Sequence, residues 1–373
     1  MVSGLIVAIG GKAELRVCGR APQVGAWTKR LPPVFEVDEE DENDVCLKPC
    51  GLHGAPPAPP PLLAPAGVEE EPLGDPLELR EDADRADEAM ARLACSSRTE
   101  RRRIVAWLSE ASQALALSKH GCRVVQKALD VAEGPCRAAL AARLQPCVDE
   151  LYRSPHGNHV LSKMVEVLPA ASMGFAIAEF SGQAVTVAQH RFGSRVLERL
   201  IEHCSEAQIH GLAEEISGQA DSLSQHPYGN FVVQHLLEYG SPECQACILQ
   251  RLLPSLPQLA THRIASRVVQ RLLDCCGEQG RDAVGGALLR AERPYSIVDV
   301  AGNRFGALVA EELAGVQGRG DEARARLSQG LAELCKSKSG RRVLGRFGLL
   351  PAKDPSSLPD DRVGRTAEAA AAA

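Results

Sequence analysis

A short pattern recurs at a fixed interval through the middle of the chain. Five copies open on a small residue, and successive copies lie 36 residues apart. The opening residues are Gly121, Gly157, Gly193, Gly229 and Ala265. Two weaker copies follow, at 306–311 after 41 residues and at 340–345 after 34. Self-similarity at such a period indicates structural repeats that stack, because one repeat cannot bury its own apolar face.

Each copy has the pattern of one face of a helix. Its apolar residues keep the same offsets, which place them together along about three helical turns. In the first copy they are Val124, Val125, Ala128 and Leu129. A second apolar-periodic stretch precedes each opening residue, as at 139–151, 208–223 and 244–259. With aromatic residues at only 3%, the sequence predicts an all-α fold of two-helix repeats rather than a β-sandwich.

The two ends differ in composition from the repeats. Residues 1–95 carry 9 Lys and Arg against 18 Asp and Glu, with an acidic run at 36–44 and a Pro/Ala tract at 55–65. Such a segment cannot bury enough apolar surface to offset its ordering entropy. We expect a disordered acidic leader over 1–74, an N-terminal cap over 75–95, repeats over about 96–350 and a disordered tail over 351–373. The leader is either a solvated linker or a segment that docks a partner.

Several classes of function are disfavoured. The longest apolar run, at 5–9, is far short of the roughly 20 residues that a membrane-spanning helix needs. Thirteen cysteines without a short, even framework or a secretory signal indicate a reducing, intracellular setting. Cys244 and Cys247 have no second pair at a metal-ligand spacing, so we expect them to be structural. A full phosphate-binding loop and a Gly-x-Ser-x-Gly motif are both missing, and we expect no enzyme, cofactor or metal.

Histidines stand at or near the turn before five successive copies. They are His120, His156, His190, His226 and His262. None has a carboxylate or thiolate partner at a ligand spacing, so we expect turn and packing roles rather than metal binding or catalysis.

Three positions of each copy vary while the apolar residues between them do not. They are the two residues after the opening residue and the residue three further on. The first and third are i and i+4, so they stand side by side on one helix face, and the second projects beside them. Two such polar groups can hydrogen-bond to the edge of one planar ring, while the residue at the second position stacks on the face of that ring. The second position holds a planar group able to stack on a base in five repeats: Arg123, His159, Arg195, Phe231 and Arg267.

The 36-residue period and the motifs HGCRVVQ, HGNHVLSK, FGSRVLE, YGNFVVQ and ASRVVQ resemble the Pumilio (PUF) family of RNA-binding repeats. The resemblance covers about residues 96–350. It implies a curved right-handed solenoid of three-helix or two-helix repeats, whose concave face binds single-stranded RNA, one base per repeat, with the N-terminal repeat taking the 3′ base. By the same resemblance we expect a regulator of messenger stability or translation in the cytoplasm.

The resemblance also implies which base each repeat reads. The first and third positions would contact base edges, and in chain order these pairs are Cys122 and Gln126, Asn158 and Ser162, Ser194 and Glu198, Asn230 and Gln234, and Ser266 and Gln270. Repeats one and five resemble adenine readers, repeat four a uracil reader and repeat three a guanine reader. Glu198 suits guanine, because a carboxylate accepts from its donor-rich Watson–Crick edge. Antiparallel reading gives the core 5′-AUGUA-3′.

Three repeats depart from the family pattern. In repeat two, Asn158 and His159 resemble a uracil reader, but Ser162 stands where Gln is expected. Repeats six and seven lack a stacking group or a paired polar grip. Their Glu311, Arg341 and Arg342 are weaker candidates, for phosphate contacts or for none.

Two other interpretations stay open. A protein-binding solenoid of the armadillo or HEAT type would use the concave face for peptides, although its period is near 40–47 residues. A nucleolar PUF-like protein of ribosome production is also compatible, since no sorting signal decides the compartment. The repeat region carries 30 Lys and Arg against 26 Asp and Glu, which suits reading bases better than binding phosphates in bulk. We expect a monomer whose convex face or leader engages regulatory proteins.

Overall fold

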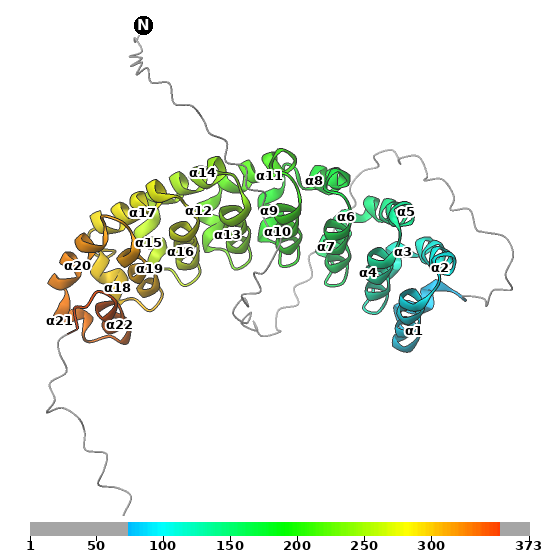
Figure 1. Ribbon diagram of the computed structural model, residues 1–373, viewed down its shortest axis with the longest axis horizontal. Helices are drawn as coiled ribbons and strands as arrows, with labels where there is room; N and C mark the ends of the chain where they lie inside the picture. The colour runs from blue at the N-terminus through cyan, green and yellow to red at the C-terminus, as the bar shows by residue number, and fades with distance from the viewer. Residues whose placement is uncertain (1–73, 351–373) are drawn as a thin grey trace, which may run out of the picture. The chain divides into compact units, whose positions relative to one another are not determined.

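The computed structural model describes residues 74–350. The chain divides into two units, Met1–Pro57 and Ala58–Ala373, and the first lies outside the described residues. The expectation of disorder in the leader and the tail falls on residues 1–73 and 351–373, which also lie outside the described residues. Within 74–350 the secondary structure is helical and contains no strand. The predicted all-α solenoid is therefore confirmed, and Figure 1 shows these helices stacked into a curved row.

The helices form three parallel rows along the curve (Figure 1). The inner row lines the concave side and consists of α1 (Ala83–Cys95), α4 (Gly121–Val131), α7 (Gly157–Val167), α10 (Gly193–His203), α13 (Gly229–Tyr239), α16 (Ser266–Cys275), α19 (Gly306–Glu312) and α22 (Lys338–Arg346). The outer row consists of α2 (Arg98–Glu110), α5 (Gly134–Leu144), α8 (Gly174–Phe180), α11 (Glu206–Gly218), α14 (Pro242–Leu252), α17 (Glu278–Arg290) and α20 (Gly320–Gln329).

Short helices form the middle row between them. They are α3 (Ser112–Ala116), α6 (Val148–Arg153), α9 (Ala184–Gln189), α12 (Ala220–Gln225), α15 (Leu256–Thr261), α18 (Ile297–Gly302) and α21 (Leu331–Leu334). Five 3₁₀ turns complete the described part: η1 (Pro76–Arg80), η2 (Gln145–Cys147), η3 (Ala170–Met173), η4 (Leu253–Ser255) and η5 (Leu313–Gly315).

Each repeat has three helices, so the prediction of two from the periodicity was wrong, and the three-helix alternative that the resemblance left open is correct. The stretch before each opening residue divides into an outer and a middle helix. Pro146 in η2 and Pro254 in η4 lie at two of these breaks, because proline has no backbone N–H and its ring clashes with the preceding helical turn. In repeat four the break falls where α11 ends at Gly218.

The core runs without interruption from Leu79 to Phe347. Inner helices supply the apolar residues that the repeat pattern marked, and in the first repeat Val124, Val125 and Leu129 are fully buried. Each inner helix packs on the next one along the row. The segment 75–95, expected to be a cap, forms η1 and α1, and α1 begins the inner row by packing on α4.

In repeats two to seven, the turn before the inner helix is closed by a side chain three residues ahead of the opening residue. His190, His226 and His262 accept a hydrogen bond through Nδ1 from the N–H of the opening residue, at 3.1, 3.2 and 3.2 Å. In repeats two, six and seven the acceptors are Ser154, Asn303 and Ser337. Burial lowers the pKa of His190 and of His226, which favours the neutral ring that can accept. The expected turn role is confirmed for these three histidines.

The opening glycines lie against the backbone of the preceding middle helix. A Cβ at Gly157 would lie 2.8 Å from both the Cα and the carbonyl oxygen of Leu151. At Gly193 it would lie 2.8 Å from the carbonyl oxygen of Val187. In repeat five, where Ala265 opens the copy, the inner helix begins one residue later, at Ser266. Close packing of the middle and inner helices therefore requires glycine in most repeats.

Replacing Gly157 by Ala is expected to lower the free energy of unfolding by about 1–3 kcal/mol, because a methyl group is forced against backbone atoms. The matched control is Gly211→Ala in α11, where a Cβ would meet nothing within 4 Å. That change should raise the free energy of unfolding by about 0.5–1 kcal/mol, since alanine loses less backbone entropy in a helix. Urea unfolding followed by circular dichroism measures both, and similar shifts for the two variants would contradict this account.

Candidate functional site

The three variable positions of each repeat lie in register on the inner row. The first residue of each triplet is buried, with exposed fractions of 1–4%; these residues are Cys122, Asn158, Ser194, Asn230 and Ser266. The third residues are half-buried, namely Gln126, Ser162, Glu198, Gln234 and Gln270. The second residues, Arg123, His159, Arg195, Phe231 and Arg267, are all exposed. Each repeat thus presents a projecting planar group beside a recessed polar pair, on an open surface.

Backbone atoms determine what the buried asparagines can offer. Nδ2 of Asn230 donates to the carbonyl oxygens of His226 at 2.8 Å and Pro227 at 2.9 Å. Asn158 makes the same two bonds, to Ser154 and Pro155. With both amide hydrogens engaged, only Oδ1 remains to interact outward, and it is an acceptor.

The third residues are held to different degrees. Nε2 of Gln234 donates to Oδ1 of Asn230 at 3.0 Å, which joins the two edge residues of repeat four. In repeat one, Nε2 of Gln126 donates to the carbonyl oxygen of Cys122 at 3.0 Å. In both repeats the amide is oriented by its own helix. The shorter Ser162 is half-buried at the corresponding place in repeat two.

The second residues have surroundings that suit a flat, accessible group. Phe231 is 41% exposed, an unusual value for a large apolar side chain. Burial and the nearby charge of Arg195 lower the pKa of His159, so its ring is neutral and able to stack at physiological pH. Arg123 is bound by Asp87 of α1 at 3.1 Å. Asp87 was missed in the sequence because α1 lacks the motif, although it lies 36 residues before Arg123.

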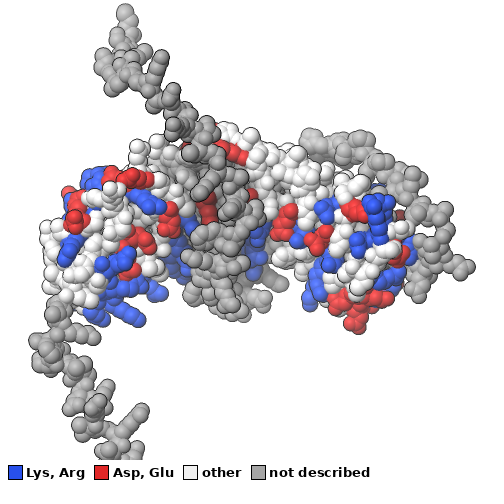
Figure 2. Space-filling model, viewed as in Figure 1, with Lys and Arg blue, Asp and Glu red and all other residues white. Residues whose placement is uncertain are grey.

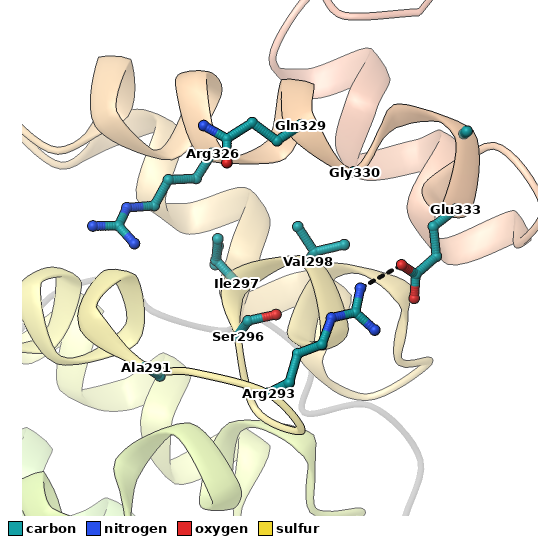
Figure 3. A pocket seen from close by; sticks show the side chains of 10 residues that line it. Ala291, Arg293, Ser296, Ile297, Val298, Arg326, Gln329, Gly330 and Glu333 are labelled. Atoms are coloured by element: carbon teal, nitrogen blue, oxygen red, sulfur yellow. Dashed lines mark hydrogen bonds and ion pairs between the residues drawn. The ribbon is translucent and has the colours of Figure 1, made fainter.

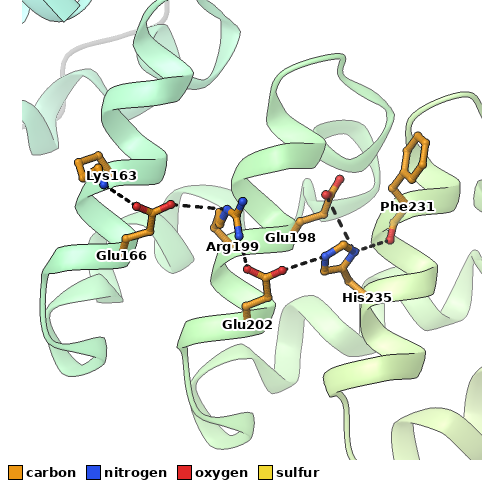
Figure 4. A network of polar contacts seen from close by, with 7 residues as sticks. All are labelled: Lys163, Glu166, Glu198, Arg199, Glu202, Phe231 and His235. Atoms are coloured by element: carbon orange, nitrogen blue, oxygen red, sulfur yellow. Dashed lines mark hydrogen bonds and ion pairs between the residues drawn. The ribbon is translucent and has the colours of Figure 1, made fainter. Parts of the chain in front are cut away.

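A ladder of charges runs across the inner row beside the triplets (Figure 4). Lys163 pairs with Glu166 at 2.7 Å, and Glu166 approaches Arg199 of the next repeat at 3.8 Å. Arg199 pairs with Glu202 at 2.6 Å, and Glu202 reaches His235 of the following repeat at 3.0 Å. The ladder has a signal in the sequence, since a cation recurs one residue after the triplet and an acid three residues further on, but the pairing between repeats is visible only in the structure.

The ladder limits the net charge of the concave face. Arg271 continues the alternation one repeat later by pairing with Glu238 at 3.7 Å. Figure 2 likewise shows Lys and Arg mixed with Asp and Glu at both ends of the described part instead of one field of a single sign. Cations already paired with carboxylates attract phosphates less strongly. This surface is therefore built for contacts with planar groups more than for bulk phosphate binding.

The last two repeats lack such a site. In repeat six Ala307 is buried and Leu308 is 43% exposed, so a branched aliphatic chain occupies the stacking position. Glu311 is bound by Arg342 of the next repeat. Nη1 of Arg341 donates to the carbonyl oxygen of Cys335 at 2.7 Å. Two of the three weaker candidates are thus engaged with each other.

A cavity of about 460 Å³ lies away from the triplets, between α18 and the α20–α21 region. Figure 3 shows Arg293 extended across it toward Glu333; the two side chains form an ion pair at 2.5 Å. Arg293 also approaches Asp299 at 3.4 Å. The positive charge of Arg293, which could attract an anionic ligand to this cavity, is therefore already compensated by two carboxylates.

Two further properties concern the described residues 74–350. They contain no group of three or more His, Cys, Asp or Glu placed to hold a metal ion. Within the same range, no helix combines the length and the apolar character needed to cross a bilayer.

A family model supports the repeat assignment. The model, described as a Pumilio-family RNA binding repeat, matches residues 113–144, 183–217, 219–253 and 256–284. These segments contain α4, α10, α13 and α16, the inner helices of repeats one, three, four and five. Repeat two, where Ser162 departs from the pattern, lies outside them. Comparison with curated protein sequences finds no significant match.

Solved structures show the same fold. PUF-8 in complex with PBE-RNA superimposes with a TM-score of 0.69 at 22% identity, covering 74% of this chain and 82% of that one. The Puf4 RNA-binding domain, bound to the HO endonuclease RNA 3′ UTR recognition sequence, gives 0.65 at 23% identity, with coverage of 74% and 88%. Yeast Puf5p bound to SMX2 RNA gives 0.59 at 17% identity, with coverage of 73% and 85%.

Proposed function

Since this chain is a divergent member of the Pumilio (PUF) repeat family, we propose that its concave face binds single-stranded RNA sequence-specifically, one base per repeat. The observation that carries the proposal is the common register of five exposed planar side chains on consecutive inner helices, each beside a recessed polar pair. Stacking on such a group is worth about 1–3 kcal/mol per base. Repeats one to five then form a continuous track for five bases.

The edge residues support the bases assigned to repeats three and four. In repeat four, both amide hydrogens of Asn230 bond to the backbone, so Oδ1, which also accepts from Gln234, is the group of Asn230 that can accept the imino N–H of uracil. In repeat three, Glu198 offers only acceptors when ionised, and guanine offers adjacent imino and amino donors. The neutral pairs of repeats one and five are assigned to adenine. Antiparallel reading gives 5′-AUGUA-3′ as the preferred core.

We further propose that the RNA is messenger RNA bound in its 3′ untranslated region, and that binding regulates stability or translation in the cytoplasm. Two of the structural neighbours, Puf4 and Puf3, were solved with RNA 3′ UTR recognition sequences, which supports this assignment by analogy. Regulation would require protein partners, for which the convex face and the leader are available. The chain acts as a monomer in this proposal, because one inner row already supplies the whole track.

Fluorescence anisotropy tests the proposal directly. The full chain is titrated against a labelled ten-base RNA containing AUGUA and against one containing AUCUA, at about 50 and 200 mM salt. We expect the cytosine substitution to weaken binding by about 1–3 kcal/mol, the scale of one base contact. Equal binding to both RNAs with a steep salt dependence would contradict sequence-specific reading. Failure to bind either RNA would favour a protein-docking solenoid.

A further inference from the structure

Glu198 differs in charge from the other third-position residues of repeats one to five. The corresponding residues are Gln126, Ser162, Gln234 and Gln270, all neutral. Its carboxylate is half-buried, with 21% of the side chain exposed. Burial raises the pKa of Glu198, and the charge of His235 opposes that effect. A carboxylate that reads guanine must be ionised to accept two hydrogen bonds, so nearby cations that favour its ionised form matter; on its own helix these are Arg195 and Arg199.

His235 of α13 lies beside that carboxylate. Nδ1 of His235 is 4.0 Å from Oε2 of Glu198 and 3.0 Å from the carbonyl oxygen of Phe231. Nε2 is 3.0 Å from Oε1 of Glu202. Figure 4 shows the imidazole between the two glutamates and the backbone of Phe231. His235 thus lies against Glu198 of α10, the predicted guanine reader, and against the backbone of Phe231, the stacking residue of the next repeat.

The surroundings of His235 favour the doubly protonated form of its ring. Both ring nitrogens face oxygen atoms that can only accept, a carbonyl and a carboxylate. An imidazole that donates from both nitrogens is the imidazolium cation. Burial is the largest single influence and lowers the pKa of His235, but the hydrogen bond to Glu202 and the charge of Glu198 outweigh it, so the pKa is raised overall.

Other charges around His235 are already paired. Glu202 shares its carboxylate between His235 and Arg199, and its pKa is lowered because these contacts outweigh its burial. The ring of Tyr239 stacks on the imidazole with centroids 5.8 Å apart. From α16, Arg271 pairs with Glu238. His235 is therefore the cation of the following repeat that reaches Glu198.

We propose that His235 is a specificity-determining positioning residue, which holds the Glu198 carboxylate ionised and oriented for guanine in repeat three. The inference rests on the proposed RNA-binding function and deepens it. The imidazolium does not touch the base. It acts through Glu198 by charge and through Phe231 by fixing the backbone that carries the adjacent stacking ring.

The test compares binding to ten-base RNAs containing AUGUA and AUAUA by anisotropy. In His235→Gln we expect the preference for guanine over adenine to fall by about tenfold, the scale of one charge-assisted contact. His235→Lys should retain the preference for guanine, because it keeps a cation at this position. Lysine already stands at the same position in repeats one and two, as Lys127 and Lys163. The matched control is Arg271→Gln. Arg271 occupies the position of His235 one repeat later, where the edge residue of the preceding repeat is the neutral Gln234. This change should leave the preference for guanine unchanged.

Measuring the preference for guanine over a series of pH values gives a second test. A purely structural role of His235 would not make that preference depend on pH. The active form pairs the His235 imidazolium with the ionised Glu198 carboxylate. The guanine preference should therefore decline as the pH rises through the pKa of His235, which the hydrogen bond to Glu202 and the charge of Glu198 raise above its ordinary value despite burial. His235→Lys should remove that decline, because lysine keeps its charge to a much higher pH. A thermal unfolding curve of each variant accompanies the binding data.

The outcomes separate the two proposals. If the unmodified protein fails to discriminate guanine at all, the proposed function fails and not merely this inference. If it discriminates guanine but His235→Gln does so equally well, the role of His235 is refuted. Equal losses in His235→Gln and Arg271→Gln would also refute it, because they would show a general effect of the charge ladder.

Discussion

Changing Asn230 to Ser together with Gln234 to Glu is expected to convert repeat four from a preference for uracil to one for guanine. The double change reproduces in α13 the pair that Ser194 and Glu198 form in α10. Each base contact is worth about 1–3 kcal/mol, so affinity for AUGUA should fall and affinity for AGGUA should rise by about five- to 150-fold each. Anisotropy with the two RNAs measures the shift.

The structure explains why this conversion should succeed in repeat four. Asn230 and Gln234 are joined by their own hydrogen bond at 3.0 Å, so they must be exchanged together. A new carboxylate at 234 would find Arg271 in the position that His235 has relative to Glu198. Asn230→Ser alone is the control, and it should weaken uracil binding without creating guanine binding. An unchanged order of preference in the double variant would show that the base assignments are wrong.

Replacing Phe180 by Ala is expected to lower the free energy of unfolding by about 3–5 kcal/mol. Phe180 ends α8 and is fully buried. Its ring meets that of Tyr152 in α6 edge to face, with centroids 5.3 Å apart, and Tyr152 meets His190 in the same way at 5.5 Å. These rings fill the junction of repeats two and three, so truncation leaves a cavity between two repeats.

Urea unfolding followed by circular dichroism measures this loss. Leu308→Ala is the control, since Leu308 is 43% exposed on α19 and substitutions at such surface sites usually stay within about 0.5 kcal/mol. In a stack of repeats, stability depends on interfaces between neighbours, so Phe180→Ala should also separate the unfolding of the N-terminal repeats from that of the rest. A single transition at the unmodified midpoint would contradict this role for Phe180.

Pairing the cations of the ladder with carboxylates has a physical advantage for base reading. Unpaired cations would bind any RNA through its phosphates, with affinity that falls steeply with salt. In the ladder from Lys163 to His235 the cations are paired with Glu166 and Glu202. Discrimination then depends on stacking and edge contacts, which differ between bases.

Features that depend on periodicity within one helix could be predicted from the amino-acid sequence. The 36-residue interval and the offsets of the valines were enough to predict the all-α solenoid. They were also enough to place Arg123 and Phe231 at one exposed register, because a helix of known phase determines which of its own residues share a face. The sequence also indicated that repeat six lacks the stacking group and repeat seven the paired polar grip, and the structure places the exposed Leu308 at the stacking position of repeat six.

Contacts between repeats could not be predicted in this way, because they depend on how the helices pack. His235 and Glu198 come from different helices, as do Arg342 and Glu311, and Asp87 and Arg123. Whether such side chains meet depends on the rotation and shift from one inner helix to the next, which packing of the whole stack determines and no single motif encodes. The division of each predicted helix into an outer and a middle helix has the same origin, because both must pack against the inner row to bury their apolar faces.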